Sequence, residues 1–471
     1  MRRVVVVILD GLRRDFIDAT RTPNLRRFAA RATSFAAHRS AFPSATRCVS
    51  ATFATGCHPA RHGLQGNAVA LLENGILVPH DAGLPGFLQH KREVTGRTLA
   101  EPTLAERLAP HGGAVIFNNV SPGAAYAHDP DGFGHLHHRA GSFAPGRIPA
   151  GRLDVTLDAA GDRVMTQRFL AEALRSAVRI GEPRIAKPHI AASDIAASDI
   201  AASDIDDSGI DDSGIDDSGI SSPSGTRPPS LALLWCAEPD HIQHDQPLGS
   251  PEHLAVLAEA DRNAGAVIDA VDRLRRDGDD VLLIVGSDHG HETVCGLVDV
   301  EAELIAAGLK FGPGSTDVVA QSNGTATLIY VAPEYTALCS ALGSFLRTCD
   351  WAGRVIGTDQ LASVGQAPDN GLAFAVSMRA SAAPNRYGVP GSALAATPRT
   401  GEAHPVGAGQ HGGLAAFEQS PFLMMDGDGF PPATTSSRST HIVDLAPTIL
   451  THLRLKATGM DGSPLQHLPP G

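Results

Sequence analysis

Three apolar runs, each leading to an aspartate, most strongly constrain how this 471-residue chain can fold. VVVVIL precedes Asp10, LALLWCAEP precedes Asp240, and VLLIVGS precedes Asp288. Continuous apolar runs of this kind are typical of strands buried on both faces, as in parallel sheets covered by helices. Because ligands gather beyond the carboxyl ends of such strands, we expect the three acids to converge on one rim of the sheet.

Amphipathic stretches alternate with the apolar runs, which is the pattern of an α/β fold with a mostly parallel central sheet sandwiched by helices. We expect strands at residues 4–9, 114–117, 231–235, 281–285 and 327–331. We expect helices at residues 24–31, 163–179, 252–276 and 444–453. The sequence predicts one catalytic domain over residues 1–471, in which residues 299–405 add sheet-edge elements and an inserted cap that shapes the substrate pocket.

A pentapeptide repeat occupies residues 190–220, where IAASD occurs three times and IDDSG follows three times. Such a period can build a square β-helix, but this repeat makes only about one and a half coils, too few to bury a core. We therefore predict a low-complexity, disordered insertion at residues 186–229. Residues 190–225 hold nine aspartates and no lysine, arginine or glutamate, so the formal charge of −13 would be −4 without them. This balance argues against nucleic-acid binding through a basic surface.

The cysteines and the first apolar run indicate the cellular compartment of the protein. The six cysteines show no CxxC pair and no regular spacing, which predicts reduced thiols rather than a disulfide framework. The first apolar run is far too short to span a membrane, and no small-residue cleavage site follows it. We expect a cytoplasmic protein without membrane association, and the sequence leaves its oligomeric state open.

Histidines join the three strand-end acids to form a set of metal-ligand residue types. They are His244, four residues after Asp240, His289, directly after Asp288, and His411. Carboxylates and imidazoles gathered in this way suit two divalent metal ions about 4 Å apart. Thr46 adds a hydroxyl, which suggests a nucleophile that the metals activate, so we expect a hydrolase that transfers phosphoryl or sulfuryl groups.

The residues around Thr46 carry a family resemblance. Thr46 lies nine residues before a Thr-Gly pair, a Pro-x-x-His-Gly stretch follows at residues 59–63, and Asn67 comes 21 residues after Thr46. Asp-x-x-x-His, Ser-Asp-His-Gly and a late Gln-His-Gly-Gly follow further along the chain. In these motifs the chain resembles the alkaline phosphatase superfamily, and within it the nucleotide pyrophosphatase/phosphodiesterase group. Thr46 would then begin a helix, whose positive end favours a developing phosphate anion.

The resemblance implies a mechanism and a role for each residue. One metal ion would be held by Asp10, Thr46, Asp288 and His289, and the other by Asp240, His244 and His411. Both ions would be Zn²⁺, although the ligand set also accepts Mn²⁺ or Fe²⁺. Asn67 would share the charge of a non-bridging oxygen. The implied activity is hydrolysis of phosphodiester or pyrophosphate bonds in a small-molecule or nucleotide substrate, through a phosphoryl-threonine intermediate.

Other members of the superfamily offer alternative functions. A phosphomonoesterase usually places a cation against the extra phosphate charge, whereas Asn67 is neutral; Arg47 could supply that cation. A phosphonoacetate-type C–P hydrolase usually adds pocket lysines, and this chain has only four lysines. Sulfatases modify the cysteine of a C-x-P-x-R string, which here begins at Cys57, but theirs occupies the position of Thr46. A protein that keeps the fold and binds metal without catalysis is the remaining alternative.

Five further histidines could take part in the site. His241 is a competing ligand beside Asp240, although the family pattern favours His244. A second group crowds around an Asp-Pro-Asp-Gly turn and could line the pocket, bind a third ion or simply be solvated: His128, His135, His137 and His138.

The repeat lies between site elements and should be dispensable for chemistry. Deletion of residues 190–225 is expected to leave kcat/KM within about twofold of the full-length enzyme, because the repeat is too short to bury a core. Steady-state assays of both proteins check this expectation. Collapse of activity in the deleted protein would mean that the repeat is structural.

Overall fold

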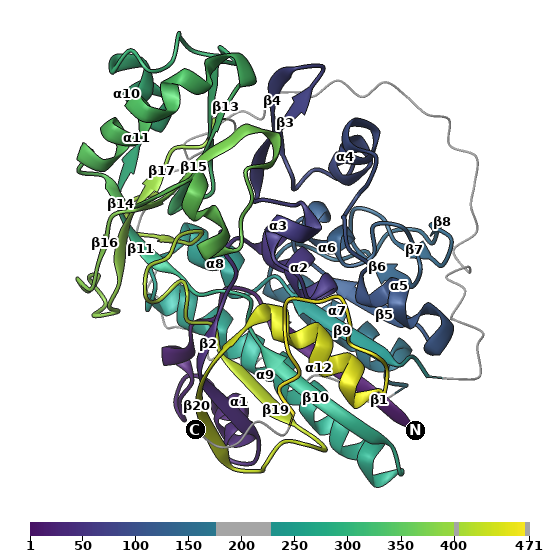
Figure 1. Ribbon diagram of the computed structural model, residues 1–471. Helices are drawn as coiled ribbons and strands as arrows, with labels where there is room; N and C mark the ends of the chain where they lie inside the picture. Colours follow the sequence, from purple (N-terminus) through teal and green to yellow (C-terminus); the bar gives the residue numbers. More distant parts are fainter. Residues whose placement is uncertain (176–227, 400–404, 467–471) are drawn as a thin grey trace, which may run out of the picture.

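The computed structural model describes residues 1–175, 228–399 and 405–466 (Figure 1). The pentapeptide repeat, and the predicted insertion as far as residue 227, lie outside the described residues.

The predicted α/β fold is confirmed by a ten-stranded central sheet among the described residues. Its neighbouring strands run in the order β20-β2-β19-β10-β1-β9-β5-β6-β7-β8. Their bounds are β20 Thr434–His441, β2 Thr33–Arg39, β19 Leu423–Asp426, β10 Asp280–Gly286, β1 Arg2–Leu9, β9 Leu231–Cys236, β5 Ala114–Asn118, β6 His135–His137, β7 Phe143–Ala144 and β8 Ile148–Pro149. The five strands from β10 to β6 pair in parallel, whereas β19 runs antiparallel to both of its neighbours.

Helices cover both faces of this sheet (Figure 1), which explains why residues 4–9 of β1 are all apolar. Val4, Val6 and Ile8 point into one core with α2 (Thr46–Thr55), α5 (Leu104–Leu108), α6 (Pro122–Ala127) and α12 (Leu445–His452). The alternate residues of β1 point into the opposite core with α1 (Pro23–Ala29), α7 (Ala159–Glu172) and α9 (Pro251–Arg276). A strand with two buried faces needs an apolar residue at every position.

Further sheets lie beside the central one. An antiparallel sheet has the order β12-β13-β15-β14, with bounds Val318–Ser322, Ala326–Val331, Leu372–Met378 and Ala352–Gly357. A mixed sheet has the order β16-β17-β11-β18, with bounds Ala380–Ser381, Ser392–Ala396, Glu292–Val298 and Gly409–Gln410, and in it β11 and β17 pair in parallel. Strands β3 (Ala68–Glu73) and β4 (Ile76–Asp81) form a hairpin. The other helices include α3 Pro59–His62, α4 Phe87–Thr95, α8 Asp240–Asp245, α10 Val300–Ala306 and α11 Cys339–Thr348. The assignment of residues 299–405 as a cap stays a prediction.

Two of the predicted elements are present but differ from the prediction in their sheet or their first residue. The run at residues 327–331 is a strand, but it belongs to the antiparallel β12-β13-β15-β14 sheet. Ile329 and Val331 enter one apolar core and Leu328 and Tyr330 enter another, so a strand outside the parallel sheet is also buried on both faces. Helix α7 begins at Ala159, four residues before the prediction, because the Asp158 carboxylate caps it by accepting a hydrogen bond from the Gly161 amide.

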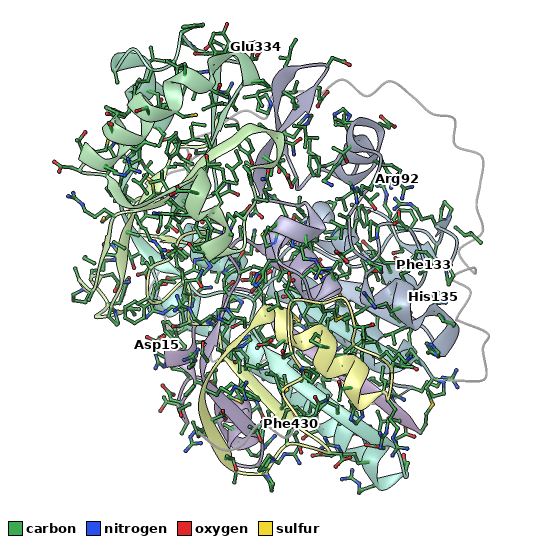
Figure 2. The ribbon with its side chains drawn as sticks, viewed as in Figure 1. Asp15, Arg92, Phe133, His135, Glu334 and Phe430 are labelled. Carbon is green, nitrogen blue, oxygen red and sulfur yellow. The ribbon has the colours of Figure 1, made fainter. Side chains whose placement is uncertain are left out.

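The helix that begins at Thr46 depends on one buried aromatic ring. Phe53 of α2 is fully buried and packs edge-on against Trp235 of β9, with 6.1 Å between ring centroids. Phe53→Ala is expected to lower the free energy of unfolding by about 3–5 kcal/mol through lost burial and a residual cavity. Urea denaturation measures the change. Phe133→Ala is the matched control, because Phe133 is 39% exposed (Figure 2). Equal effects of the two substitutions would contradict this account.

Candidate active site

The three strand-end aspartates lie side by side because β1 lies between β9 and β10. Asp10 follows β1, Asp288 follows β10, and Asp240 begins helix α8 beyond β9. The Asp240 amide donates to the carbonyl of Asp10 over 3.0 Å, and the Gly11 amide donates to Asp288 Oδ1 over 3.1 Å. Gly11 has a φ of +67°, and a Cβ there would lie 2.8 Å from His291 Nε2. A side chain at this position would therefore push the cluster apart.

One group of side chains gathers around the imidazole of His289. Its Nε2 lies 3.3 Å from Asp10 Oδ1, 3.2 Å from Asp288 Oδ2 and 3.1 Å from the hydroxyl of Thr46. His289 Nδ1 donates to the carbonyl of Gly290, so Nε2 turns its lone pair toward the group. The structure thus brings together the four residues predicted for the nucleophile-side metal.

A second group gathers around the carboxylate of Asp240. Its Oδ2 lies 3.4 Å from His244 Nε2, and its Oδ1 lies 3.5 Å from His411 Nε2. The two imidazole Nε2 atoms are 3.3 Å apart. His411 Nδ1 donates to the carbonyl of Ser44 over 2.6 Å, which leaves its Nε2 free to act as a ligand. The three residues predicted for the second metal therefore also meet.

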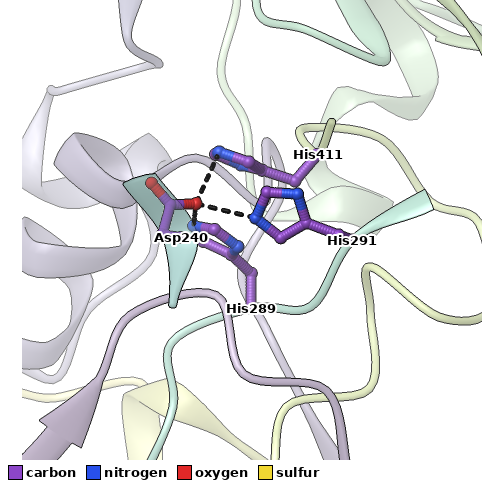
Figure 3. Close-up of side chains that lie close together, drawn as sticks. All are labelled: Asp240, His289, His291 and His411. Atoms are coloured by element: carbon purple, nitrogen blue, oxygen red, sulfur yellow. Dashed lines mark hydrogen bonds and ion pairs between the residues drawn. The ribbon is translucent and has the colours of Figure 1, made fainter. Parts of the chain in front are cut away.

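His291, two residues beyond His289 in the segment between β10 and β11, was not among the predicted site residues. His291 is fully buried, and its Nε2 donates to Asp240 Oδ1 over 2.7 Å (Figure 3). Ligand atoms of Asp240, His289, His291 and His411 lie within 4.8 Å of one another, and so do those of Asp10, Asp288 and His289. His289 thus joins the two groups. The signal in the sequence was a second histidine directly after the Asp-His-Gly string.

The charges of this cluster fit divalent cations. Burial, together with the charges of Asp288 and Asp240, raises the pKa of Asp10 well above its ordinary value. Burial also raises the pKa of Asp288. Burial opposes ionisation of Asp240 as well, but its charge interaction and hydrogen bond with His244 and the hydrogen bond from His291 lower its pKa well below the ordinary value. Asp10 Oδ1 and Asp288 Oδ2 are buried without a hydrogen-bond donor. Cations at these oxygens would offset the charge repulsion.

Thr46 is the first residue of α2, and Asn67 stands beside it. The backbone amide of Arg47 donates to Asn67 Oδ1 over 3.0 Å, so the NH₂ group of Asn67 remains available to donate to a substrate. Asn323 in turn holds Asn67, because its Oδ1 accepts a hydrogen bond from the backbone N–H of Asn67 over 2.6 Å.

A cleft of about 560 Å³ opens onto the cluster. Its lining includes Asp10, Thr46, Asn67, Asp240, His244 and His411. His241 also lines it, but its ring is turned to Glu238, with 3.4 Å between Nδ1 and Oε1. A cleft of this size suits a small molecule.

The remaining candidates from the sequence lie away from this cleft. None of the four histidines between residues 128 and 138 lines it in the described part of the chain. His128 packs against Phe53 and Trp235, and His137 stacks on Phe117 with 4.2 Å between ring centroids. Cys57 is buried elsewhere, and burial raises the pKa of its thiol to about 11.

Comparison with known proteins fixes the family. A sequence model of the family described as type I phosphodiesterase / nucleotide pyrophosphatase matches residues 4–338. The chain belongs to this family. The resemblance expected from the sequence is thereby confirmed, and with it the broad class of phosphodiester hydrolase. A search of curated proteins found no sequence that matches this chain. No helix in the described residues is long and apolar enough to cross a membrane.

Solved structures with a similar fold include murine ectonucleotide pyrophosphatase/phosphodiesterase 5, which is 15% identical with a TM-score of 0.63. The structure of an inactive variant of that protein in complex with AMP has the same sequence identity and the same TM-score. The human protein is 13% identical with a TM-score of 0.62. Each alignment covers 98% of this chain, and 98%, 98% and 97% of the respective structures. At sequence identities this low, the likeness establishes that the chain shares the fold of these structures.

The hydrogen bond from His291 should support metal binding through Asp240. His291→Gln is expected to weaken the affinity of the cluster for Zn²⁺ about 10–100-fold, because outer partners of metal ligands fix their orientation. Competition with a chromophoric chelator measures the affinity. His241→Gln is the control, since His241 faces Glu238 and should leave the affinity unchanged. Unaltered affinity in His291→Gln would contradict the assigned role.

Proposed function

We propose that this protein hydrolyses phosphodiester or pyrophosphate bonds of small-molecule or nucleotide substrates, with Thr46 as the nucleophile. One observation carries the proposal: the hydroxyl of Thr46 lies at the start of α2, 3.1 Å from His289 Nε2, among buried carboxylates and imidazoles at the base of the cleft.

The residues present fit two divalent cations. Asp10, Thr46, Asp288 and His289 would hold one, and Asp240, His244 and His411 would hold the other. Such ions supply charge neutralisation at a phosphoryl group and lower the pKa of a coordinated hydroxyl. The imidazole ligands favour Zn²⁺, although the set also accepts Mn²⁺ or Fe²⁺.

The chain's own residues would then carry out two displacements. Thr46 Oγ1 gives up its proton and forms a bond to phosphorus while the bond to the leaving oxygen breaks and that oxygen takes up a proton, which gives a phosphoryl-threonine. The amino terminus of α2 and the NH₂ group of Asn67 stabilise the charge on the non-bridging oxygens. Water then gives up a proton as its oxygen bonds to phosphorus, and the bond to Thr46 breaks and Oγ1 regains a proton. Two inversions give net retention of configuration at phosphorus.

The charges that line the cleft favour diesters over monoesters. Arg47, beside the nucleophile, pairs with Asp81 at 3.3 Å between Nη1 and Oδ1. Arg399, which also lines the cleft, pairs with Glu301 at 2.8 Å. No lysine lines the cleft among the described residues. Both arginines are therefore neutralised, and neither supplies the free cation that a monoester dianion or a carboxylated phosphonate would need.

A solved structure of similar fold supports a nucleotide as the substrate. The murine structure in complex with AMP belongs to a protein of similar architecture, and that inactive variant carries a threonine-to-alanine change. We infer that a nucleoside phosphate is one class of molecule that the cleft accepts.

A substrate panel tests the proposed activity. The Zn²⁺-loaded protein should hydrolyse bis(nitrophenyl) phosphate and a dinucleoside pyrophosphate at least about tenfold faster than nitrophenyl phosphate, and nitrophenyl sulfate should not react. The reason is that a diester carries one charge less for the paired arginines to balance. Equal or faster turnover of the monoester would overturn the diesterase assignment.

The nucleophile has its own test. Thr46→Ala should lower kcat at least about 1,000-fold, because the bond to phosphorus then has no hydroxyl partner. Cys57→Ala is the control and should keep kcat within about threefold, since Cys57 lies outside the cleft. Steady-state kinetics on the diester measures both variants. Loss of activity in Cys57→Ala with retention in Thr46→Ala would reverse the assignment.

A further inference from the structure

A second cluster of metal-ligand side chains lies beside the cleft, outside the proposed catalytic residues. It consists of Glu73 at the end of β3, His80 on β4 and His90 on α4. Glu73 Oε1 lies 2.5 Å from His80 Nε2 and 2.9 Å from His90 Nε2. The two imidazole rings are 4.8 Å apart between centroids. One carboxylate oxygen and two imidazole nitrogens from three elements therefore point at one spot.

The protonation of this cluster leaves it able to bind a cation. Burial disfavours the charge on Glu73, but the hydrogen bonds from His90 and His80 outweigh it and lower the pKa of the carboxyl below its ordinary value. Among the described residues, no lysine or arginine pairs with Glu73. The carboxylate charge is thus met only by imidazole N–H groups. A cation that took their place would release those protons to Nδ1 or to water.

Two histidines and one carboxylate are a common ligand set for Zn²⁺, with a water molecule in the fourth position. Bonds of about 2.1 Å in a tetrahedral site hold ligand atoms about 3.4 Å apart. Glu73 Oε1 and His80 Nε2, now 2.5 Å apart, would have to separate by about 0.9 Å to reach that spacing. All three side chains are partly exposed, with His90 at 39%, so small rotations suffice and an ion can reach the site from solvent.

We propose that Glu73, His80 and His90 form a binding site for one Zn²⁺-type divalent cation, separate from the two ions of the proposed catalytic centre. The site would fasten the β3–β4 hairpin to α4.

The position of the hairpin gives this site a consequence for the cleft. Pro79, His80 and Asp81 of β4 line the cleft. Asp81 pairs with Arg47, the residue directly after the proposed nucleophile. A bound cation would therefore hold this wall in place and with it the partner that neutralises Arg47.

Metal stoichiometry and hydrogen exchange test the proposal together. The full-length protein and two variants, Glu73→Gln and His90→Gln, are loaded with Zn²⁺, desalted and analysed for bound zinc. His111→Gln is the matched control, because His111 is an exposed histidine whose side chain has no part in the cluster. We expect each cluster variant to hold one zinc ion fewer per chain than the wild type and the control. Added Zn²⁺ should also slow amide exchange of residues 76–81 and 87–95 in the wild type and control, but in neither variant.

Exchange in β1 shows whether the variants remain folded, and two different substitutions guard against a local disturbance by either one. Equal zinc content in all four proteins, or hairpin exchange that does not respond to Zn²⁺, would overturn the proposal. Failure of the proposed catalytic centre would lower the zinc content of all four proteins alike and would leave the difference between them. The two proposals can therefore fail separately.

Discussion

Three carboxylates buried at one rim of the central sheet impose the constraint on which the rest of this molecule depends. Ionised carboxylates are unfavourable away from water unless donors or cations surround them. Trp235, Gly11 and His291 each donate one hydrogen bond to a different member of the trio. One oxygen of Asp10 and one of Asp288 still have no donor. The fold thus concentrates negative charge that its own hydrogen bonds only partly balance, which is the electrostatic condition for binding divalent cations.

Segments far apart in the sequence surround this charge and hold one another in place. Ser44, two residues before the proposed nucleophile, donates its backbone amide to the carbonyl of Gly412, and its carbonyl accepts a hydrogen bond from His411. The last of the predicted metal ligands and the start of α2 are therefore fixed together. Asn323, at the end of β12, accepts the amide of Asn67 and so joins the antiparallel sheet to the substrate side of the cleft. The architecture outside the central sheet mainly positions the walls around the cluster.

Much of the fold was predictable because a strand that is buried on both faces appears in the sequence as a continuous apolar run. The strands before Asp10, Asp240 and Asp288 contain long apolar runs, and their carboxyl ends had to meet at one rim. The same pattern predicted the strand at residues 327–331 but not its place in a separate antiparallel sheet, because two cores also bury both faces of β13. His291 was missed for a different reason. Its partner, Asp240, lies 51 residues away, and no local pattern specifies their hydrogen bond.

The sequence by itself determined the α/β class and the family, and it supplied the residues proposed as nucleophile and metal ligands, because residue type, periodicity and motif spacing are local properties. Only the tertiary structure decided that His289 joins the two ligand groups, that Asp81 neutralises Arg47, and that Glu73 meets two histidines beside the cleft. Such contacts depend on the relative placement of separate elements. The physical reason is that the strength of a charge interaction depends on the distance between the two groups in the folded protein. The order of residues along the chain does not specify that distance.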